Sequence, residues 1–261
     1  MTVFSESDLA RFRADGYAVM RNVLTPAEIL VLQSEGDRLQ KLDHLMQPSN
    51  LRTVSRSKIS GGEVIDRFDP VIDLSEPLRA LVRDERLLMP LRCILEDEPI
   101  LFKDKIIFKE PQTCGYTVHQ DYTVWRELPA PAEAIISVMV AIDDASPASG
   151  AVEFFPGLHR KHYCEQAVKD IFDPAYGVVP QEVVAGLEPD MPSLAAGDLV
   201  ILSSLTPHRS GPNRSQKRRC AVFLSFNAGR FGNLYDLYYR TFRDYLTRDR
   251  TSAGTTDLYF Q

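Results

Sequence analysis

The stretch DLVILSSLTPHRSGPNRSQKRRCAVFLSFN, residues 198–227, decides the fold class. It opens with a short apolar run at 198–204, turns at a Gly-Pro pair, and resumes as an apolar run at 219–227. Short apolar runs bounded by turn residues are typical of strands in mainly β proteins. The stretch therefore predicts two strands, with His208 in the turn that follows the first of them.

Working outward, the chain predicts helices at its two ends and strands between them. Four more runs have strand character, at 101–109, 116–125, 134–142 and 152–155. The predicted helices are one capped by Ser5 and ending at Asp15-Gly16, one opened by the capping box Thr25-Pro26-Ala27-Glu28 and running to about Leu42, one at 76–95 and one at 235–249. A short extended piece is expected at 17–20, and the polar segment 44–66 is expected to be a mobile loop.

This order predicts a mainly β fold with α-helices. We expect a double-stranded β-helix (jelly-roll, cupin-like) core, covered by the N-terminal helices and a C-terminal helix. No linker or repeat divides the chain, so residues 1–261 are interpreted as a single domain. The ending TTDLYFQ resembles the remainder of a cleavable tag, at about 252–261.

Composition narrows the class of function. The chain has 261 residues, 44% of them hydrophobic and 25% charged, with a formal net charge of −6, which argues against a nucleic-acid partner. No run approaches the length of a membrane span, and the first residues do not resemble a signal peptide. Four scattered cysteines suit a reducing compartment. We expect a cytoplasmic monomer or homodimer that acts on a small molecule.

A His-x-Asp motif supplies the first candidate for chemistry. His119 and Asp121 lie inside the predicted strand 116–125, so they point to one side, about 7 Å apart, while Gln120 faces away. One imidazole and one carboxylate on one face can grip a metal ion, although such tripeptides also recur by chance. With His208 as third ligand, two histidines and one carboxylate form the facial triad of non-haem iron(II) oxygenases.

The residues after His208 add a candidate anion site. Ser210 lies two residues past that histidine, and Arg219 lies eleven past it on the next predicted strand. A guanidinium with a hydroxyl beside it suits a carboxylate, such as the distal one of 2-oxoglutarate. Because strand side chains alternate, only one of Arg218 and Arg219 can point inward.

Taken together, the motifs GYTVHQDYTVW, SGAVEFFPGLH and GDLVILSSLTPHRSGPNRS, followed by Arg219, resemble the phytanoyl-CoA dioxygenase (PhyH) family over about residues 10–245. The resemblance implies a double-stranded β-helix that uses Fe(II), O₂ and 2-oxoglutarate as co-substrate. It implies His119, Asp121 and His208 as catalytic metal ligands, and Arg219 with Ser210 at the 2-oxoglutarate carboxylate.

The same resemblance suggests contacts for cofactor and substrate. Lys103 is a candidate for binding the co-substrate, and it stands where ectoine hydroxylase usually has a glutamine, which argues against ectoine as substrate. Trp125 and Tyr122 are candidate substrate contacts, as is Lys105, which shares a strand face with Lys103. Arg56 is a further candidate, and it or Arg52 could pair with an anionic substrate from the polar segment.

We therefore predict a 2-oxoglutarate-dependent dioxygenase that hydroxylates an unactivated C–H bond of a small polar or anionic molecule, such as an aminophosphonate or amino acid, releasing succinate and CO₂. One alternative is the oxidation of a natural-product scaffold such as a terpenoid. Others are a cupin-like metal isomerase or hydrolase, which has no use for Arg219, and a non-catalytic metal-binding module. His159 and His162 have zinc-like spacing but are interpreted as surface residues.

Overall fold

The computed structural model describes residues 4–47, 49–164 and 177–252; the ending TTDLYFQ lies outside these ranges. The α-helices are α1 (Glu6–Asp15), α2 (Pro26–Leu39), α3 (Glu76–Leu81), α4 (Glu85–Leu95), α5 (Gln181–Val184) and α6 (Tyr235–Ser252). The strands are β1 (Tyr17–Met20), β2 (Thr53–Ser57), β3 (Glu63–Phe68), β4 (Pro99–Lys109), β5 (Tyr116–His119), β6 (Ile135–Ala141), β7 (Val152–Phe154), β8 (Leu199–Ser203), β9 (His208–Ser210) and β10 (Arg219–Ala228).

The strands form two antiparallel sheets. The larger sheet has seven strands in the order β1-β8-β6-β10-β4-β3-β2, and the smaller has three in the order β5-β9-β7. Neighbours in space are far apart in sequence, as in a jelly roll, but the larger sheet does not close into a barrel. The mainly β fold with a jelly-roll core and covering helices is therefore confirmed, as an open pair of sheets.

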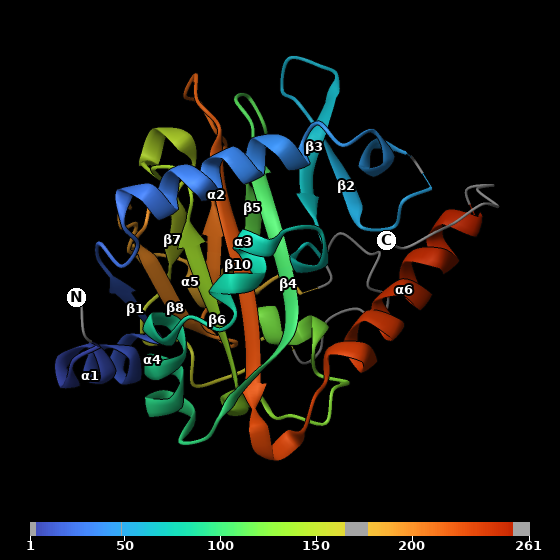
Figure 1. Ribbon diagram of the computed structural model, residues 1–261. Coiled ribbons are helices and arrows are strands. Elements are labelled where there is room, and N and C mark those ends of the chain that lie inside the picture. Colours follow the sequence, from blue (N-terminus) through green and yellow to red (C-terminus); the bar gives the residue numbers. More distant parts are fainter. Residues whose placement is uncertain (1–3, 48, 165–176, 253–261) are drawn as a thin grey trace.

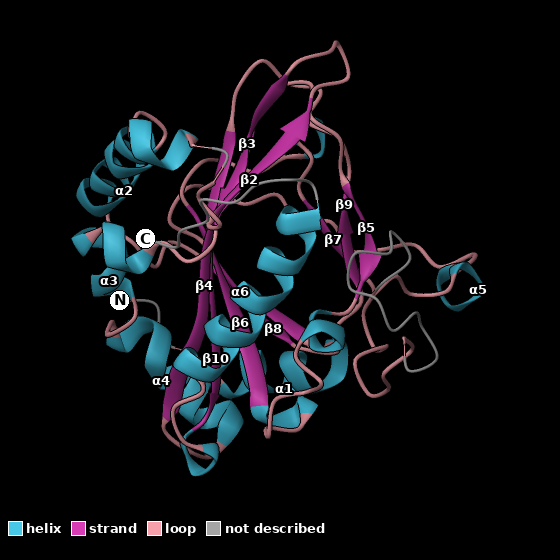
Figure 2. Ribbon diagram, turned by 90° about the vertical axis from the view of Figure 1, so that its right-hand side faces the viewer, coloured by secondary structure: helices cyan, strands magenta, loops and turns pink. Residues whose placement is uncertain are grey.

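Alternating side chains give the larger sheet two buried faces. One face, including Val138 and Val222, packs against helical residues such as Leu32 and Leu91. The opposite face packs against the smaller sheet, for example through Met139. Figure 2 shows this order edge-on, with α2 and α3 on one side of the larger sheet and β5, β9 and β7 on the other. The space between the two sheets is where inward-facing polar groups can meet.

The capping signals place the N-terminal helices as expected. Ser5 and Thr25 each accept a hydrogen bond from the third helical residue and form a capping box, and Gly16 ends α1 in the left-handed conformation. Helix α2 crosses the front of the larger sheet in Figure 1. The helix expected at 76–95 is two helices, because Asp84 adopts extended backbone and caps a new start.

Two other expectations were wrong. The segment 44–66 is not a loop: it contains β2 and most of β3, which pair with each other and extend the sheet from β4. The strand expected at 116–125 ends at His119, and a 3₁₀ helix follows at Asp121–Val124. No described helix is long and apolar enough to cross a membrane.

Candidate metal centre

Three candidate ligands come together between the sheets. His119 at the end of β5 is the register partner of His208 at the start of β9, so adjacent strands bring the two imidazoles side by side, with ring centroids 4.2 Å apart. Asp121 opens the 3₁₀ turn, and its Oδ1 lies 3.8 Å from His119 Nε2. One ligand atom from each of the three residues lies within 4.8 Å of the other two.

Backbone carbonyls orient both imidazoles. His119 Nδ1 lies 2.8 Å from the Thr117 carbonyl oxygen, and His208 Nδ1 lies 2.9 Å from that of Thr206. With Nδ1–H donating in each case, Nε2 is left as the lone-pair nitrogen that faces the shared point. A hydrogen bond on the far nitrogen is the usual way to fix a metal-binding tautomer.

The charges of the triad suit a cation. Burial, followed by the proximity of His208, lowers the pKa of His119 to about 4, so this imidazole is neutral near pH 7. Burial alone would raise the pKa of Asp121, but His208, Lys105 and His119 outweigh it and lower that pKa. Two imidazole nitrogen donors and one carboxylate around an open point match a divalent transition metal.

Gln120 holds the turn that aims Asp121. Its Nε2 donates to the carbonyls of Lys161 and Leu205, at 2.7 and 2.6 Å, and its Oε1 accepts from the Tyr163 amide. The sequence placed Gln120 on the side away from the metal. The structure adds that its buried amide joins β5 to two loops.

A cavity of about 430 Å³ opens beside His119 and Asp121 of the triad. Its walls include His119 and Asp121, basic groups from β3 and β4, and one face of α6. The residues from α6 are Leu237, Tyr238, Thr241, Phe242, Tyr245 and Leu246, spaced as one side of a helix. This helix lies beside β4 (Figure 1).

Two of the three lysines of β4, Lys103 and Lys105, line this cavity, as does Arg67 on β3. Lys103 is ion-paired with Asp69 at 3.4 Å and also bonds to the Tyr238 hydroxyl. Lys105 has no hydrogen bond or ion pair with any described residue, and burial, then the charge of Lys103, lowers its pKa to about 8. Arg67 was missed by sequence reasoning because it directly follows the segment 44–66, which was taken for a loop, and no strand was expected there.

A second group of cations lies at the far end of β4. Arg219 is the register partner of Lys109, and both side chains are buried. Lys109 Nζ lies 2.7 Å from Ser210 Oγ, whereas Nε and Nη1 of Arg219 are buried with no hydrogen-bond partner among the described residues. Arg218 points the other way, to Asp143 and Asp37. Lys109 was missed as a site residue, although the alternation of side chains in a strand at 101–109 places it on the same face as Lys103 and Lys105.

Lys103 does not join Arg219 and Ser210. It lies six residues along β4 from Lys109, about 20 Å at the usual strand rise. It therefore stands at the α6 end of the cavity, away from the group at Arg219.

Four other candidates do not line the cavity among the described residues. Trp125 is 1% exposed, and its ring meets that of Phe102 edge-on, so it is a core residue. Tyr122 packs in the same cluster and contacts the His162 ring. Arg56 pairs with Asp66 at 2.8 Å and donates to the Gly115 carbonyl. The buried Arg52 pairs with Asp73, so it does not reach into the cavity.

His159 and His162, which have zinc-like spacing in the sequence, are partly buried rather than surface residues. They form no metal cluster with described residues. His162 Nε2 lies 2.9 Å from Thr123 Oγ1, so this imidazole supports the turn after Asp121.

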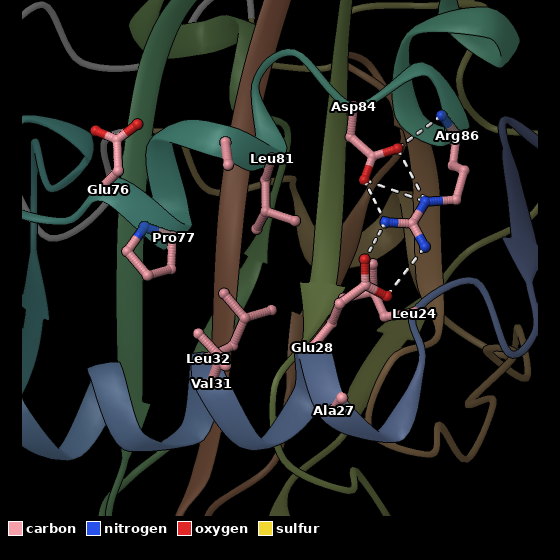
Figure 3. Close-up of a pocket in the computed structure, with 11 residues that line it drawn as sticks. Leu24, Ala27, Glu28, Val31, Leu32, Glu76, Pro77, Leu81, Asp84 and Arg86 are labelled. Atoms are coloured by element: carbon pink, nitrogen blue, oxygen red, sulfur yellow. Dashed lines mark hydrogen bonds and ion pairs between the residues drawn. The ribbon is translucent and has the colours of Figure 1, made fainter.

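A larger apolar cavity of about 570 Å³ lies between α2 and α3 and contains none of the triad (Figure 3). Its arginine, Arg86, is bound by Asp84 and Glu28. With its guanidinium already paired and no candidate ligand in its walls, this cavity offers no catalytic group.

Two histidines and a carboxylate lie between the jelly-roll sheets, and the buried Arg219 can bind an anion. This combination defines the class of non-haem iron oxygenases. The chain matches the Phytanoyl-CoA dioxygenase (PhyH) family over residues 12–221. It therefore belongs to that family, and it is a dioxygenase dependent on iron and 2-oxoglutarate.

Named relatives cover most of the chain. A methylphosphonate hydroxylase of Gimesia maris is 26% identical, covering 97% of this chain and 92% of the relative. A 2-aminoethylphosphonate dioxygenase of an uncultured bacterium is 24% identical, covering 87% and 83%. Among solved structures, EctD from S. alaskensis with 2-oxoglutarate and 5-hydroxyectoine superposes with a TM-score of 0.70 at 22% identity, covering 86% of this chain and 76% of EctD.

Proposed function

We propose that this enzyme hydroxylates an unactivated C–H bond of a small polar or anionic molecule, with iron(II) held by His119, Asp121 and His208. The observation that carries the proposal is the convergence of these three ligand atoms, within 4.8 Å, beside a cavity with basic walls. Bound iron(II), with 2-oxoglutarate and O₂, supplies the oxidation and releases succinate and CO₂.

Arg219, Lys109 and Ser210 would hold the distal carboxylate of 2-oxoglutarate. An unpaired buried guanidinium costs several kcal/mol unless an anion reaches it. Two guanidinium nitrogens of Arg219 lack a partner, and a lysine and a hydroxyl lie beside this position. These donors match one carboxylate, because a guanidinium grips its two oxygens in parallel.

The protein's own work is orientation and exclusion of water. The backbone carbonyls of Thr117 and Thr206 fix the imidazoles, and Gln120 fixes the turn that carries Asp121. The apolar side of α6 forms the outer wall of the cavity, where it shields the reacting carbon from solvent.

The substrate class follows from the cavity and from the relatives. Basic groups from β3 and β4 favour an anion. Relatives are named for methylphosphonate, 2-aminoethylphosphonate and hypophosphite, and others for ectoine. With its cysteines 93, 114, 164 and 220 all free, we also propose that the enzyme works in the cytoplasm, as a monomer or homodimer.

A second candidate is the oxidation of a natural-product scaffold. The apolar residues of α6 could hold such a ring system, and one structural neighbour is the epimerase SnoN from nogalamycin biosynthesis, with a TM-score of 0.68 at 21% identity. The basic groups on the opposite wall favour the anionic substrate over this one.

A succinate-release screen with Fe(II) and 2-oxoglutarate tests the proposal. We expect turnover with a member of a panel of phosphonates and amino acids. Turnover of only an uncharged scaffold would support the second candidate. Metal binding without succinate formation from any substrate would favour a non-catalytic module, and turnover independent of 2-oxoglutarate would favour a cupin-like isomerase or hydrolase.

A further inference from the structure

One end of the cavity carries more positive charge than its carboxylates balance. Arg67, Lys103 and Lys105 on β3 and β4 line it, and Arg56 on β2, which does not line the cavity itself, shares the carboxylate of Asp66 with Arg67. Asp66 and Asp69 are the two acids that pair with them. Asp121 belongs to the metal site, and the cavity's remaining acid, Glu127, lies 3.5 Å from Arg126. Two positive charges therefore remain.

The excess falls on Arg67 and Lys105. Asp69 is taken by Lys103, and Asp66 is held by Arg56 at 2.8 Å and by the Tyr116 hydroxyl. Arg67 reaches that shared carboxylate only at 3.6 Å, and its Nε is buried without a hydrogen-bond partner. Lys105 makes no ion pair with any described residue, its nearest ring being Phe223 at 5.1 Å.

The two excess cations are neighbours on one sheet face. Arg67 is the register partner of Ile107 across β3 and β4, and Lys105 lies two residues along from that partner. Diagonal neighbours of this kind have side-chain origins about 7–8 Å apart. Two long basic side chains that start at this distance can close on one small group, and both line the cavity over Asp121.

We propose that Arg67 and Lys105 bind the head group of the substrate, and that this head group is a doubly charged tetrahedral oxyanion of the phosphonate type. Two partly buried positive charges are balanced by one dianion, whereas a carboxylate or sulfonate leaves one of them uncompensated. The opposite wall, formed by α6, is largely apolar and fits a short carbon chain.

This assignment rests on the proposed function. The reaction inserts one oxygen atom of O₂ into a C–H bond of the phosphonate. The other oxygen atom enters succinate as 2-oxoglutarate loses CO₂. The C–H bond and 2-oxoglutarate each give up two electrons, which together reduce O₂, and the phosphonate group itself is unchanged.

The first arm of the test compares two ligands of one shape. Anaerobic calorimetry measures the binding of ethylphosphonate and of ethanesulfonate to the iron- and 2-oxoglutarate-loaded protein near neutral pH. We expect ethylphosphonate to bind at least about 10-fold more tightly, because a charged hydrogen-bonded pair is worth this factor or more. Equal affinities, or a preference for the sulfonate, would overturn the assignment of a dianion.

The second arm uses variants. Arg67→Gln and Lys105→Met should each weaken ethylphosphonate binding about 10- to 100-fold and reduce the preference over ethanesulfonate, with the affinity for 2-oxoglutarate unchanged. The controls are Arg79→Gln and Lys217→Met, whose side chains lie outside this cavity and should leave binding as in the wild type. A parallel loss of 2-oxoglutarate affinity in Arg67→Gln and Lys105→Met would overturn the proposal, since these residues would then serve the co-substrate.

Retained 2-oxoglutarate binding also shows that each variant is folded. Failure of the proposed function looks different, because the wild-type protein would then form no complex with iron(II) and 2-oxoglutarate and release no succinate. Formation of that complex with no preference for the phosphonate contradicts the head-group assignment alone.

Discussion

At the scale of single residues, the pair Arg219 and Lys109 forms the proposed site for the co-substrate. Two buried cations that are register partners repel one another, and this repulsion contributes to a lowered pKa of the lysine. Burial, then Arg219 and Arg56, lowers the pKa of Lys109 to about 7, although Asp66 and Glu153 oppose the shift. An arriving carboxylate relieves this repulsion, so the site is arranged for an anion before one is bound.

Replacement of Arg219 by alanine should raise the apparent KM for 2-oxoglutarate about 30- to 150-fold. The reason is the loss of a bidentate, charge-assisted contact worth about 2–3 kcal/mol. Steady-state succinate formation at varied 2-oxoglutarate measures the effect. An unchanged KM would assign the carboxylate to another cation, and Arg218→Ala serves as the control because Arg218 pairs with Asp143 on the other face.

The affinity for 2-oxoglutarate should fall as the pH rises above about 7. Lys109 is protonated below its pKa of about 7 in the free protein, so above that pH binding of the anion must also recover a proton. Isothermal titration calorimetry between pH 6 and 9 would measure how the affinity for 2-oxoglutarate falls with pH, together with the proton uptake on binding. In Lys109→Met this pH dependence of the affinity should be absent. A pH dependence identical to that of the wild type would show that another group titrates.

At the scale of elements, α6 is attached to β4 through buried hydroxyl and carboxyl groups. Asp104 accepts from the Val71 and Ile72 amides and from the Tyr235 hydroxyl, and Tyr239 donates to Asp69. Despite these bonds, burial raises the pKa of Asp104 to about 6. Attachment of the cavity wall therefore carries the cost of an ionised buried carboxylate near neutral pH.

That cost predicts a pH dependence of stability. The folded pKa of Asp104, about 6, lies above its ordinary value of 3.8. Its stabilising contribution is therefore complete below about pH 4 and is lost as the pH rises through 6. Relative to the wild type, Asp104→Asn should gain about 2 kcal/mol of unfolding free energy between pH 4 and pH 7. Denaturant unfolding of both proteins at several pH values measures this difference. The same change of unfolding free energy with pH in both proteins would contradict the explanation.

Gly115 allows β5 to approach β9 closely. A Cβ built there would lie 1.9 Å from the Ser210 carbonyl oxygen, so the backbone itself would have to shift. We expect Gly115→Ala to cost about 1–3 kcal/mol of stability and to weaken 2-oxoglutarate binding by moving Ser210. Thermal unfolding and titration test both effects. Gly36→Ala, whose Cβ would meet only ordinary contacts in α2, is the control, and equal behaviour of the two variants would contradict this role.

Strands made of continuous apolar residues could be predicted from the sequence, and strands of polar residues could not. β8 and β10 are buried along most of their length and appear as apolar runs. β2 is a partly exposed edge strand of polar residues, TVSRS, with no apolar pattern to detect. It pairs with β3, and β3 in turn pairs with β4, which is remote in sequence from both. For the same reason Arg67, the register partner of Ile107, could not be placed in the cavity.

The candidate ligands could be predicted for a related reason. The spacing of His119 and Asp121 and the turn before His208 are local features of the sequence. The backbone geometry expected for the first two differs from the one in the structure. A single strand was expected to align the first two, and instead a 3₁₀ turn held by Gln120 aims the carboxylate. The burial of Trp125 depends on the packing of Phe102, which no local pattern contains.

At the scale of the whole molecule, the site is assembled from segments spread over most of the chain. Two sheets bring β5 and β9 opposite β4 and β10, the N-terminal helices cover the outer face, and α6 forms the remaining wall (Figures 1 and 2). One end of β4 carries Lys109, beside Arg219, and its middle carries Lys103 and Lys105 of the cavity. Under the proposed function, this separation would let co-substrate and substrate bind on either side of one metal.

The central claim is that His119, Asp121 and His208 hold the iron that 2-oxoglutarate then chelates. Anaerobic titration of Fe(II) into the metal-free protein, with 2-oxoglutarate present, measures it through the visible charge-transfer absorption of the complex. The account predicts one iron per chain in the wild type, and no such absorption and no succinate formation in Asp121→Ala and His208→Ala, both still folded by circular dichroism. Full iron binding and wild-type succinate release in Asp121→Ala would contradict it.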